Sequence, residues 1–184
     1  MSNTHLARMP LDQMTDVQRQ AWSTLNDLTG EPGFVEVFAN TPELLSFVME
    51  DFYGRIFFGG RVAQHYKQLL RLKLSRLHGC RTCNKQNVPG ALEAGISQAQ
   101  VDAIDDHGNG PFSDAEKAVL DYAELISMSN ADRTLAAADY ERLQAHFSDA
   151  EICELGVVGA FVTGFAKLSF VLDLVEKEPY CSFR

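Results

Sequence analysis

The sequence has little of what secreted or nucleic-acid-binding proteins need. Only four cysteines occur in 184 residues, too few and too unevenly spaced for the disulfide framework of a secreted domain. Lysine and arginine number 16 against 25 acidic residues, and the net charge of −9 argues against binding to nucleic acid or to an anionic membrane. No apolar stretch near the N-terminus is long enough for a signal peptide. We therefore expect a cytoplasmic protein.

Long hydrophobic runs without charges are also absent. The most apolar segment, residues 156–175, carries Lys167 near its middle and Asp173 near its end. A charged residue at the centre of a bilayer costs at least ~2.5 kcal/mol, so a membrane span is disfavoured. We interpret this segment as a helix buried in protein.

Signals for β-strands are almost absent, whereas helix signals run along the whole chain. Several helix starts show a capping box, in which a Ser or Thr and a Glu or Gln three residues later bind each other's backbone N–H groups. These starts are Thr15, Ser97, Ser113 and Ser148, and further amphipathic runs cover residues 41–58, 62–77 and 134–147. No repeat, low-complexity tract or flexible linker marks a second domain. The sequence therefore predicts an all-α fold of seven or eight helices in one domain, residues 1–184.

One pair of cysteines is placed for chemistry. Cys80 and Cys83 stand three residues apart at a predicted helix start, so both sulfurs lie on one face and close enough for a disulfide. The N–H groups of that first turn, together with Arg76, Arg81 and Lys85, favour a thiolate over a thiol. A thiolate beside a second thiol is what two-electron redox chemistry requires.

A C-x-x-C pair has other uses as well. It also occurs as two buried structural cysteines or as half of a zinc site. Zinc would need two further ligands, and neither Cys153, Cys181 nor any histidine stands at a metal-binding spacing. A thioredoxin-type enzyme would place the motif after a β-strand, and none is visible. We therefore expect no metal and no cofactor, and we interpret Cys153 and Cys181 as bystanders, the second in a frayed tail.

Three segments together resemble one known family. They are LLRLKLSRLHGCRTCNKQNVPGALEAGISQAQVDAI around the cysteines, PFSDAEKAVLDYAELI, and HFSDAEICELGVVGAFVTGFAKLSFVLDL. The chain resembles the carboxymuconolactone decarboxylase and alkylhydroperoxidase D (AhpD)-like families from about Leu44 to about Leu174. The resemblance implies an all-α fold, with residues 1–40 as a helical extension, and homo-oligomers, often trimers or hexamers.

The resemblance also implies a thiol-dependent peroxidase and roles for its cysteines. In AhpD proteins the second cysteine attacks peroxide and the first resolves it, which corresponds to Cys83 and Cys80 here. The helix-dipole argument alone favours the opposite order, because Cys80 is nearer the helix start. Both assignments remain open at this point, with Cys83 favoured as the attacking residue.

The positions of the family's proton relay differ in this chain. A glutamate twelve residues before the first cysteine is replaced by Gln68, and a histidine four residues after the second by Asn87. Both amides can keep the hydrogen-bond geometry, but neither can take a proton near neutral pH. His78 is the nearest ionisable base, and His65 lies one turn before Gln68, although a structural role is the commoner reason for such histidines.

Two further features bear on the site. Pro89 lacks the N–H that would bond the carbonyl of Lys85, so it either kinks one helix or separates two shorter ones. Aromatic residues at helical spacing are more often core or interface than pocket lining; they are Phe34, Phe38, Phe47, Phe52, Phe57 and Phe58.

Three functions remain in competition. The leading hypothesis is a peroxidase that takes a hydroperoxide substrate and is restored by an external dithiol or reductase. A lyase of the carboxymuconolactone decarboxylase type is the enzymatic alternative, although that class works through His and Glu without a cysteine pair. The third is a non-enzymatic redox-sensing protein that lacks the relay.

Overall fold

The computed structural model describes residues 4–130 and 132–182. Over these residues all the regular secondary structure is helical and no β-strand is present, which confirms the all-α class. The α-helices are α1 (Asp16–Thr29), α2 (Gly33–Phe38), α3 (Pro42–Ser46), α4 (Gln64–His78), α5 (Arg81–Glu93), α6 (Gln98–Asp102), α7 (Asp114–Ile126), α8 (Ala137–Gln144) and α9 (Asp149–Val171). Three short 3₁₀-helices are η1 (Leu11–Gln13), η3 (Ile104–Asp106) and η4 (Met128–Asn130), and η2 (Phe47–Phe57) is a π-helix.

The described residues form nine α-helices where the sequence predicts seven or eight. The additional one is α2, whose six residues are too few to show a periodic pattern. All four capping boxes are present, at the starts of α1, α6, α7 and α9. The helix containing Pro89 is continuous, since α5 runs unbroken from Arg81 to Glu93.

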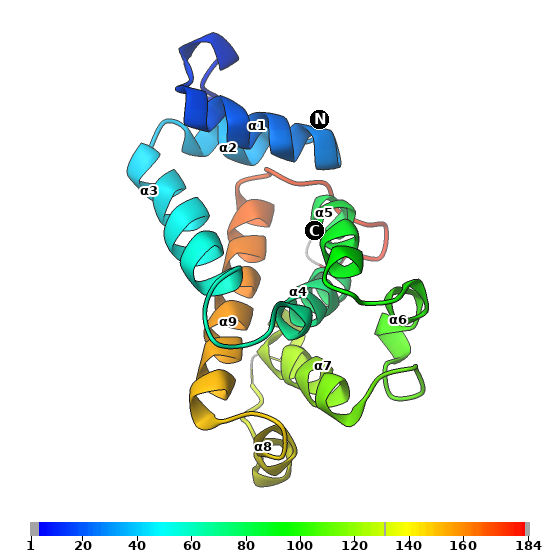
Figure 1. The fold of residues 1–184 in the computed structure, drawn as a ribbon. Coiled ribbons are helices and arrows are strands. Elements are labelled where there is room, and N and C mark those ends of the chain that lie inside the picture. The colour runs from blue at the N-terminus through cyan, green and yellow to red at the C-terminus, as the bar shows by residue number, and fades with distance from the viewer. Residues whose placement is uncertain (1–3, 131, 183–184) are drawn as a thin grey trace.

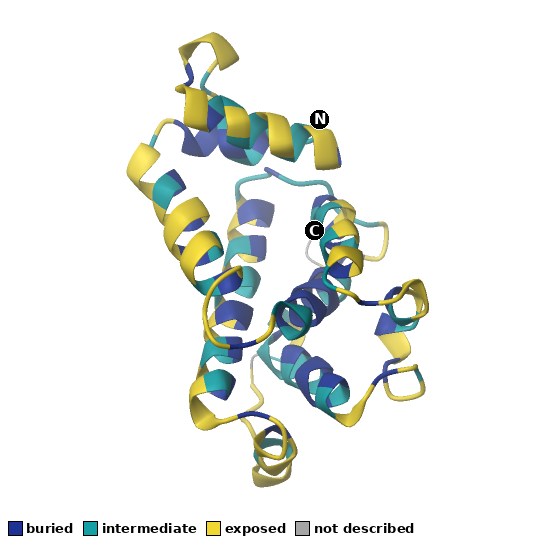
Figure 2. Cartoon of the chain, viewed as in Figure 1, coloured by how far each residue is buried: buried dark blue, intermediate teal, exposed yellow. Residues whose placement is uncertain are grey.

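Helix α4 lies at the centre of the bundle, in contact with α5, α7 and α9 (Figure 1). Leu70 and Leu74 pack into one hydrophobic cluster with α9, and Leu69 and Leu72 pack into a second with α5 and α7. Because both faces of α4 are covered, nearly all of its length is buried (Figure 2). Every side chain from Lys67 to Ser75 is buried as a result.

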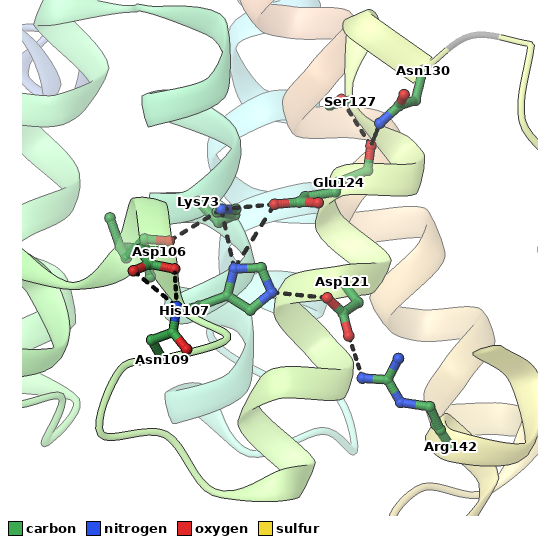
Figure 3. A network of polar contacts seen from close by, with 10 residues as sticks. Lys73, Asp106, His107, Asn109, Asp121, Glu124, Ser127, Asn130 and Arg142 are labelled. Carbon is green, nitrogen blue, oxygen red and sulfur yellow. Dashed lines mark hydrogen bonds and ion pairs between the residues drawn. The ribbon is translucent and has the colours of Figure 1, made fainter. Parts of the chain in front are cut away.

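The cations of α4 include two buried lysines. Lys73 Nζ lies 2.9 Å from Glu124 Oε1 and donates to His107 Nδ1 at 3.2 Å (Figure 3). His107 Nε2 lies 2.8 Å from Asp121 Oδ1, and Arg142 also binds Asp121. This network connects α4 to α7 and α8, and it satisfies a charge that burial would otherwise make costly.

Helix α9 is the one described helix long and apolar enough to cross a membrane by length and composition. It packs against α4, α7, α8 and η2, and Leu155 and Val158 on its inner side have no exposed surface. Only 28% of its most apolar stretch is buried, so the expectation of a helix buried in protein holds for this inner side alone.

The C-terminal segment, residues 176–181, lies across the cysteine motif. Lys177 forms an antiparallel bridge with Cys80, and the Glu178 N–H donates to Gly79 O at 2.8 Å. Cys181 is buried, and its sulfur lies 3.1 Å from His78 O. The expectation of a frayed tail at Cys181 is therefore wrong, because backbone pairing holds this segment in place.

Candidate active site

Cys80 and Cys83 form a disulfide at the start of α5, with their Cα atoms 5.2 Å apart. Cys80 is the N-cap residue of this helix, and its sulfur accepts a hydrogen bond from the Cys83 N–H at 3.2 Å. The N–H groups of Arg81 and Thr82 donate instead to Glu176 O. The α5 N-terminus therefore acts on the Cys80 sulfur through one direct hydrogen bond.

The two sulfurs differ in access. Cys80 has no exposed surface, since it packs with Phe170 and Cys181 under the C-terminal segment. Cys83 is partly exposed and lines a cavity of about 820 Å³, whose lining does not include Cys80. Residues of α1, η2, α4, α5 and α9 form the walls of this cavity. A molecule in the cavity therefore reaches Cys83 and not Cys80.

The structure brings Gln68, Asn87 and His78 to the same cavity as Cys83. Gln68 and Asn87 are each 3% exposed, so they line its inner wall. Gln68 Oε1 accepts a hydrogen bond from Arg71 Nη2 at 2.7 Å, and Asn87 Nδ2 donates to Arg71 O at 3.4 Å. The two amide side chains therefore hold the side chain and the backbone of Arg71 in place, and neither amide can accept a proton near neutral pH.

His78 is buried and lines the cavity as a neutral group. Burial lowers its pKa from 6.5 to about 4. Its Nε2 accepts the backbone N–H of Met128 at 3.3 Å, so the ring proton of the neutral imidazole is on Nδ1. His65 does not line the cavity, and its Nε2 lies 2.6 Å from Glu116 Oε1 on α7.

No protein-family model and no curated protein sequence matches the chain. Solved structures do match it. A peroxidase-related protein from Ralstonia eutropha, described as an alkylhydroperoxidase AhpD core, superposes with a TM-score of 0.73 at 14% identity, over 96% of this chain and 93% of that one. A peroxidase-related protein from Silicibacter matches with a TM-score of 0.72 at 16% identity, over 100% of both chains. The chain has the AhpD-like fold.

The AhpD-like fold also carries a different chemistry among its solved members. The debrominase Bmp8, as a Cys-to-Ala variant in complex with 2,3,4-tribromopyrrole, matches with a TM-score of 0.76 at 16% identity, over 97% of this chain and 95% of that one. Together, these structural matches support, at the level of fold, the resemblance to AhpD-like proteins inferred from the sequence.

Sequence reasoning missed Arg71, which lies in the same wall of this AhpD-like fold as Gln68. Arg71 is 5% exposed and lines the cavity. The sequence does indicate this position, because Arg71 stands between leucines on an otherwise apolar part of a predicted helix, one turn after Gln68. Tyr53 of η2 was missed for a different reason: a π-helical segment breaks the 3.6-residue period on which burial is predicted. Phe58, just after η2, was interpreted as core or interface and lines the cavity instead.

Glu31, in the loop between α1 and α2, also lines the cavity. Burial alone would raise its pKa, but hydrogen bonds from Lys85, Thr82 and the Glu176 N–H outweigh this effect and lower the pKa below 4.5. Lys85 Nζ lies 2.7 Å from Glu31 Oε1. Of the cations expected to favour a thiolate, Lys85 is therefore neutralised by Glu31, and Arg81 by Glu176 at 3.2 Å.

The aromatic residues divide between cavity and core. Phe34 and Phe58 line the cavity, whereas Phe52 and Phe57 are buried in the main hydrophobic cluster. Within the described residues, no group of three or more His, Cys, Asp or Glu side chains is placed to hold a metal ion.

Proposed function

We propose that the protein is a thiol-dependent peroxidase in which Cys83 attacks the hydroperoxide and Cys80 resolves the product. The observation that carries this proposal is the difference in access, since of the two cysteines only Cys83 lines the cavity. The AhpD-like fold of the peroxidase-related neighbours supports the same reaction class.

The cycle balances over two thiols and one hydroperoxide. The Cys83 thiolate attacks the terminal oxygen of R–O–O–H, so that an S–O bond forms, the O–O bond breaks and the alcohol leaves after protonation. The Cys80 thiol then attacks the Cys83 sulfur; an S–S bond forms, the S–O bond breaks and water leaves with the Cys80 proton. Both electrons passed to the peroxide come from the sulfurs, which end as the disulfide seen in the structure.

The proton of the Cys83 thiol goes to solvent in this proposal. Gln68 and Asn87 cannot accept it, and the depressed pKa of His78 makes that imidazole a poor acceptor. Gln68 and Asn87 instead position the wall of the cavity through Arg71, and His78 contributes a neutral ring. The peroxidase rate is therefore expected to rise with pH through the pKa of the Cys83 thiol.

An external dithiol or a reductase carrying one restores the two thiols by disulfide exchange. Such reductants keep thiols reduced in the cytoplasm, and this requirement supports the cytoplasmic location proposed for the protein.

Stopped-flow measurement of hydroperoxide consumption tests the assignment. Cys83→Ser should abolish consumption, whereas Cys80→Ser should still give one turnover and stop at a sulfenic acid that a dimedone probe traps. Cys153→Ser, which changes an exposed cysteine outside the cavity, is the matched control. Equal consumption by Cys83→Ser and the unmodified protein would refute the proposal, and a lyase activity that survives loss of both cysteines would support the alternative.

Reductive debromination is a second candidate, because the debrominase Bmp8 shares the fold over 97% of this chain. Removal of bromine from an aromatic ring as bromide also needs two electrons, which two thiols supply when they form a disulfide. Bromide release from 2,3,4-tribromopyrrole in the presence of a dithiol, compared with turnover of a hydroperoxide, distinguishes the two reactions.

We also propose that the protein is a homo-oligomer that associates through the outer face of α9. Small and apolar residues recur there every three or four positions and are exposed: Val157, Ala160, Gly164, Leu168 and Val171. Such a face allows close approach of a second helix. Light scattering of the wild type should give a trimer or hexamer, and Val157→Glu with Val171→Glu should give a monomer.

A further inference from the structure

Three cationic side chains of α4 are buried, but only two of them have a carboxylate partner. Lys67 Nζ lies 2.7 Å from Glu154 Oε1, and Lys73 Nζ lies 2.9 Å from Glu124 Oε1. Arg71 is 5% exposed and forms no ion pair with any carboxylate of the described residues. A guanidinium stays charged even when buried, so its charge lacks compensation in the protein alone.

The contacts of Arg71 hold the guanidinium but do not saturate it. Nη2 donates to Gln68 Oε1 at 2.7 Å, and Cζ lies 4.7 Å from the centre of the Phe57 ring. Burial lowers the pKa of this guanidinium, and the Tyr53 hydroxyl opposes that effect. The buried Nε–H has no hydrogen-bond partner. Because Nε has almost no accessible surface, a ligand in the cavity can reach this guanidinium only at its terminal nitrogens.

The backbone of α5 is shaped to admit this guanidinium. A Cβ atom at Gly90 would lie 2.8 Å from Arg71 Nη2, so only glycine allows this approach without displacing the arginine. Gly90 follows Cys83 by seven residues, which corresponds to about 10 Å along the helix axis. Arg71 and Cys83 therefore lie on one wall of the cavity, about two helical turns apart along α5.

The acidic residues of the cavity do not neutralise Arg71. Glu31 is bound by Lys85 at 2.7 Å, and Glu50 and Glu93 are exposed. Arg71 is the one arginine or lysine among the described residues that line the cavity. The cavity thus offers a single buried positive charge, which matches a monoanion.

We propose that this cavity binds an organic monocarboxylate with an extended apolar chain, whose carboxylate binds the terminal nitrogens of the Arg71 guanidinium. A guanidinium fork matches the two oxygens of a carboxylate in such a geometry. This inference rests on the proposed function in one respect, because it identifies the substrate as a carboxylic acid that also carries a hydroperoxide group. When the carboxylate binds Arg71, the hydroperoxide group lies further along the chain of the substrate, beside Cys83.

The remainder of the cavity suits an apolar chain. Its volume of about 820 Å³ lies within the range of sites for small organic ligands. Val17 and Phe58 line it and are also exposed, so this part of the cavity opens to solvent. The apolar lining comes from several helices: Ala21, Leu25, Leu28, Phe34, Val48, Met49, Val162 and Phe165.

Calorimetric titration of the disulfide form, without peroxide, tests the binding apart from turnover. Decanoate should bind, whereas 1-decanol and decyl phosphate should bind at least about 10-fold more weakly, because one lacks the charge and the other carries a larger, more highly charged headgroup. Equal affinity for decanol, or no binding of decanoate, would overturn the proposal. Tighter binding of decyl phosphate would overturn the assignment of a carboxylate.

Two variants locate the site. Arg71→Met should weaken decanoate binding by about 10- to 100-fold while leaving decanol unaffected, and Gly90→Ala, which keeps the charge but displaces Nη2, should also weaken it. Arg55→Met on the surface of η2 is the matched control and should bind as the wild type. A purely structural arginine predicts loss of thermal stability in Arg71→Met without a selective loss of the carboxylate, and that result would refute the proposal.

Because binding is measured without turnover, this inference and the peroxidase proposal fail separately. Decanoate binding with no peroxide consumption would remove the peroxidase and keep the carboxylate site. Peroxide consumption with no selectivity for decanoate would do the reverse.

Discussion

His78 makes the stability of the fold depend on pH between about 6.5 and 4. Its imidazole is fully buried, and its pKa falls from 6.5 in the unfolded chain to about 4 in the folded protein. Between these two values the unfolded chain binds a proton that the folded protein does not. The unfolded state is therefore favoured progressively as the pH falls from 6.5 towards 4.

The magnitude follows from the difference between the two pKa values. At pH 5 the unfolded imidazole is almost fully protonated and the folded one is mostly neutral, which lowers the free energy of unfolding by about 2 kcal/mol relative to pH 7.5. The carboxylates of Glu31, Glu116 and Glu154 have lowered pKa values, so the stability they contribute is lost only below their usual value of 4.5. The two effects therefore occupy separate pH windows.

Urea denaturation followed by circular dichroism at pH 7.5 and pH 5 measures this difference in the disulfide form. The variant His78→Gln, whose amide oxygen can still accept the Met128 N–H, should lose most of the 2 kcal/mol dependence estimated above, whereas the exposed His146→Gln should retain it. If His78→Gln and the wild type lost the same stability between the two pH values, the argument from burial would be wrong.

Three further predictions concern the scaffold and are checked by the same urea denaturation. Glu124→Gln should lower the free energy of unfolding by about 2–4 kcal/mol, because it leaves Lys73 buried without a carboxylate, and Lys73→Met in the same chain should recover part of the loss. Thr15→Ala should cost about 1 kcal/mol through loss of the α1 capping box. Gly79→Ala should lower the free energy of unfolding by at least about 2 kcal/mol, because Gly79 has a φ of 65° and a Cβ there would lie 2.8 Å from the Cys181 backbone. The same variant should make Cys181 more reactive towards iodoacetamide. An unchanged Cys181 labelling rate in Gly79→Ala would contradict the packing of the C-terminal segment described above.

The helices were predictable from the sequence because their signals are local. Each capping box involves residues three positions apart, and each amphipathic run repeats within a few turns, so Ser113 and Ser148 identified helix starts without any tertiary information. Helix α2 escaped prediction because six residues cannot display a period. Pro89 was ambiguous since the sequence does not state whether packing compensates its missing N–H, and α5 remains one helix.

The candidate site was predictable only in part. The motif indicated Cys80, Cys83, Gln68, Asn87 and His78, and all but Cys80 line one cavity. The C-terminal segment, almost 100 residues later, decides which sulfur is exposed, and no local pattern encodes that contact.

The separation of the two sulfurs explains how one motif can serve both halves of the proposed cycle. The α5 N-terminus donates a hydrogen bond to the buried Cys80 sulfur, whereas the cavity exposes Cys83. An external dithiolate can therefore attack only the Cys83 sulfur, and the thiolate that leaves is Cys80, stabilised by the Cys83 N–H. A sulfur with a low pKa is the better leaving group, so the helix dipole promotes reduction of the disulfide. The exposure of Cys83 to the cavity, in contrast, favours attack of this residue on the hydroperoxide. The dipole argument and the family resemblance favour different cysteines as the attacking residue because they apply to different steps of the proposed cycle.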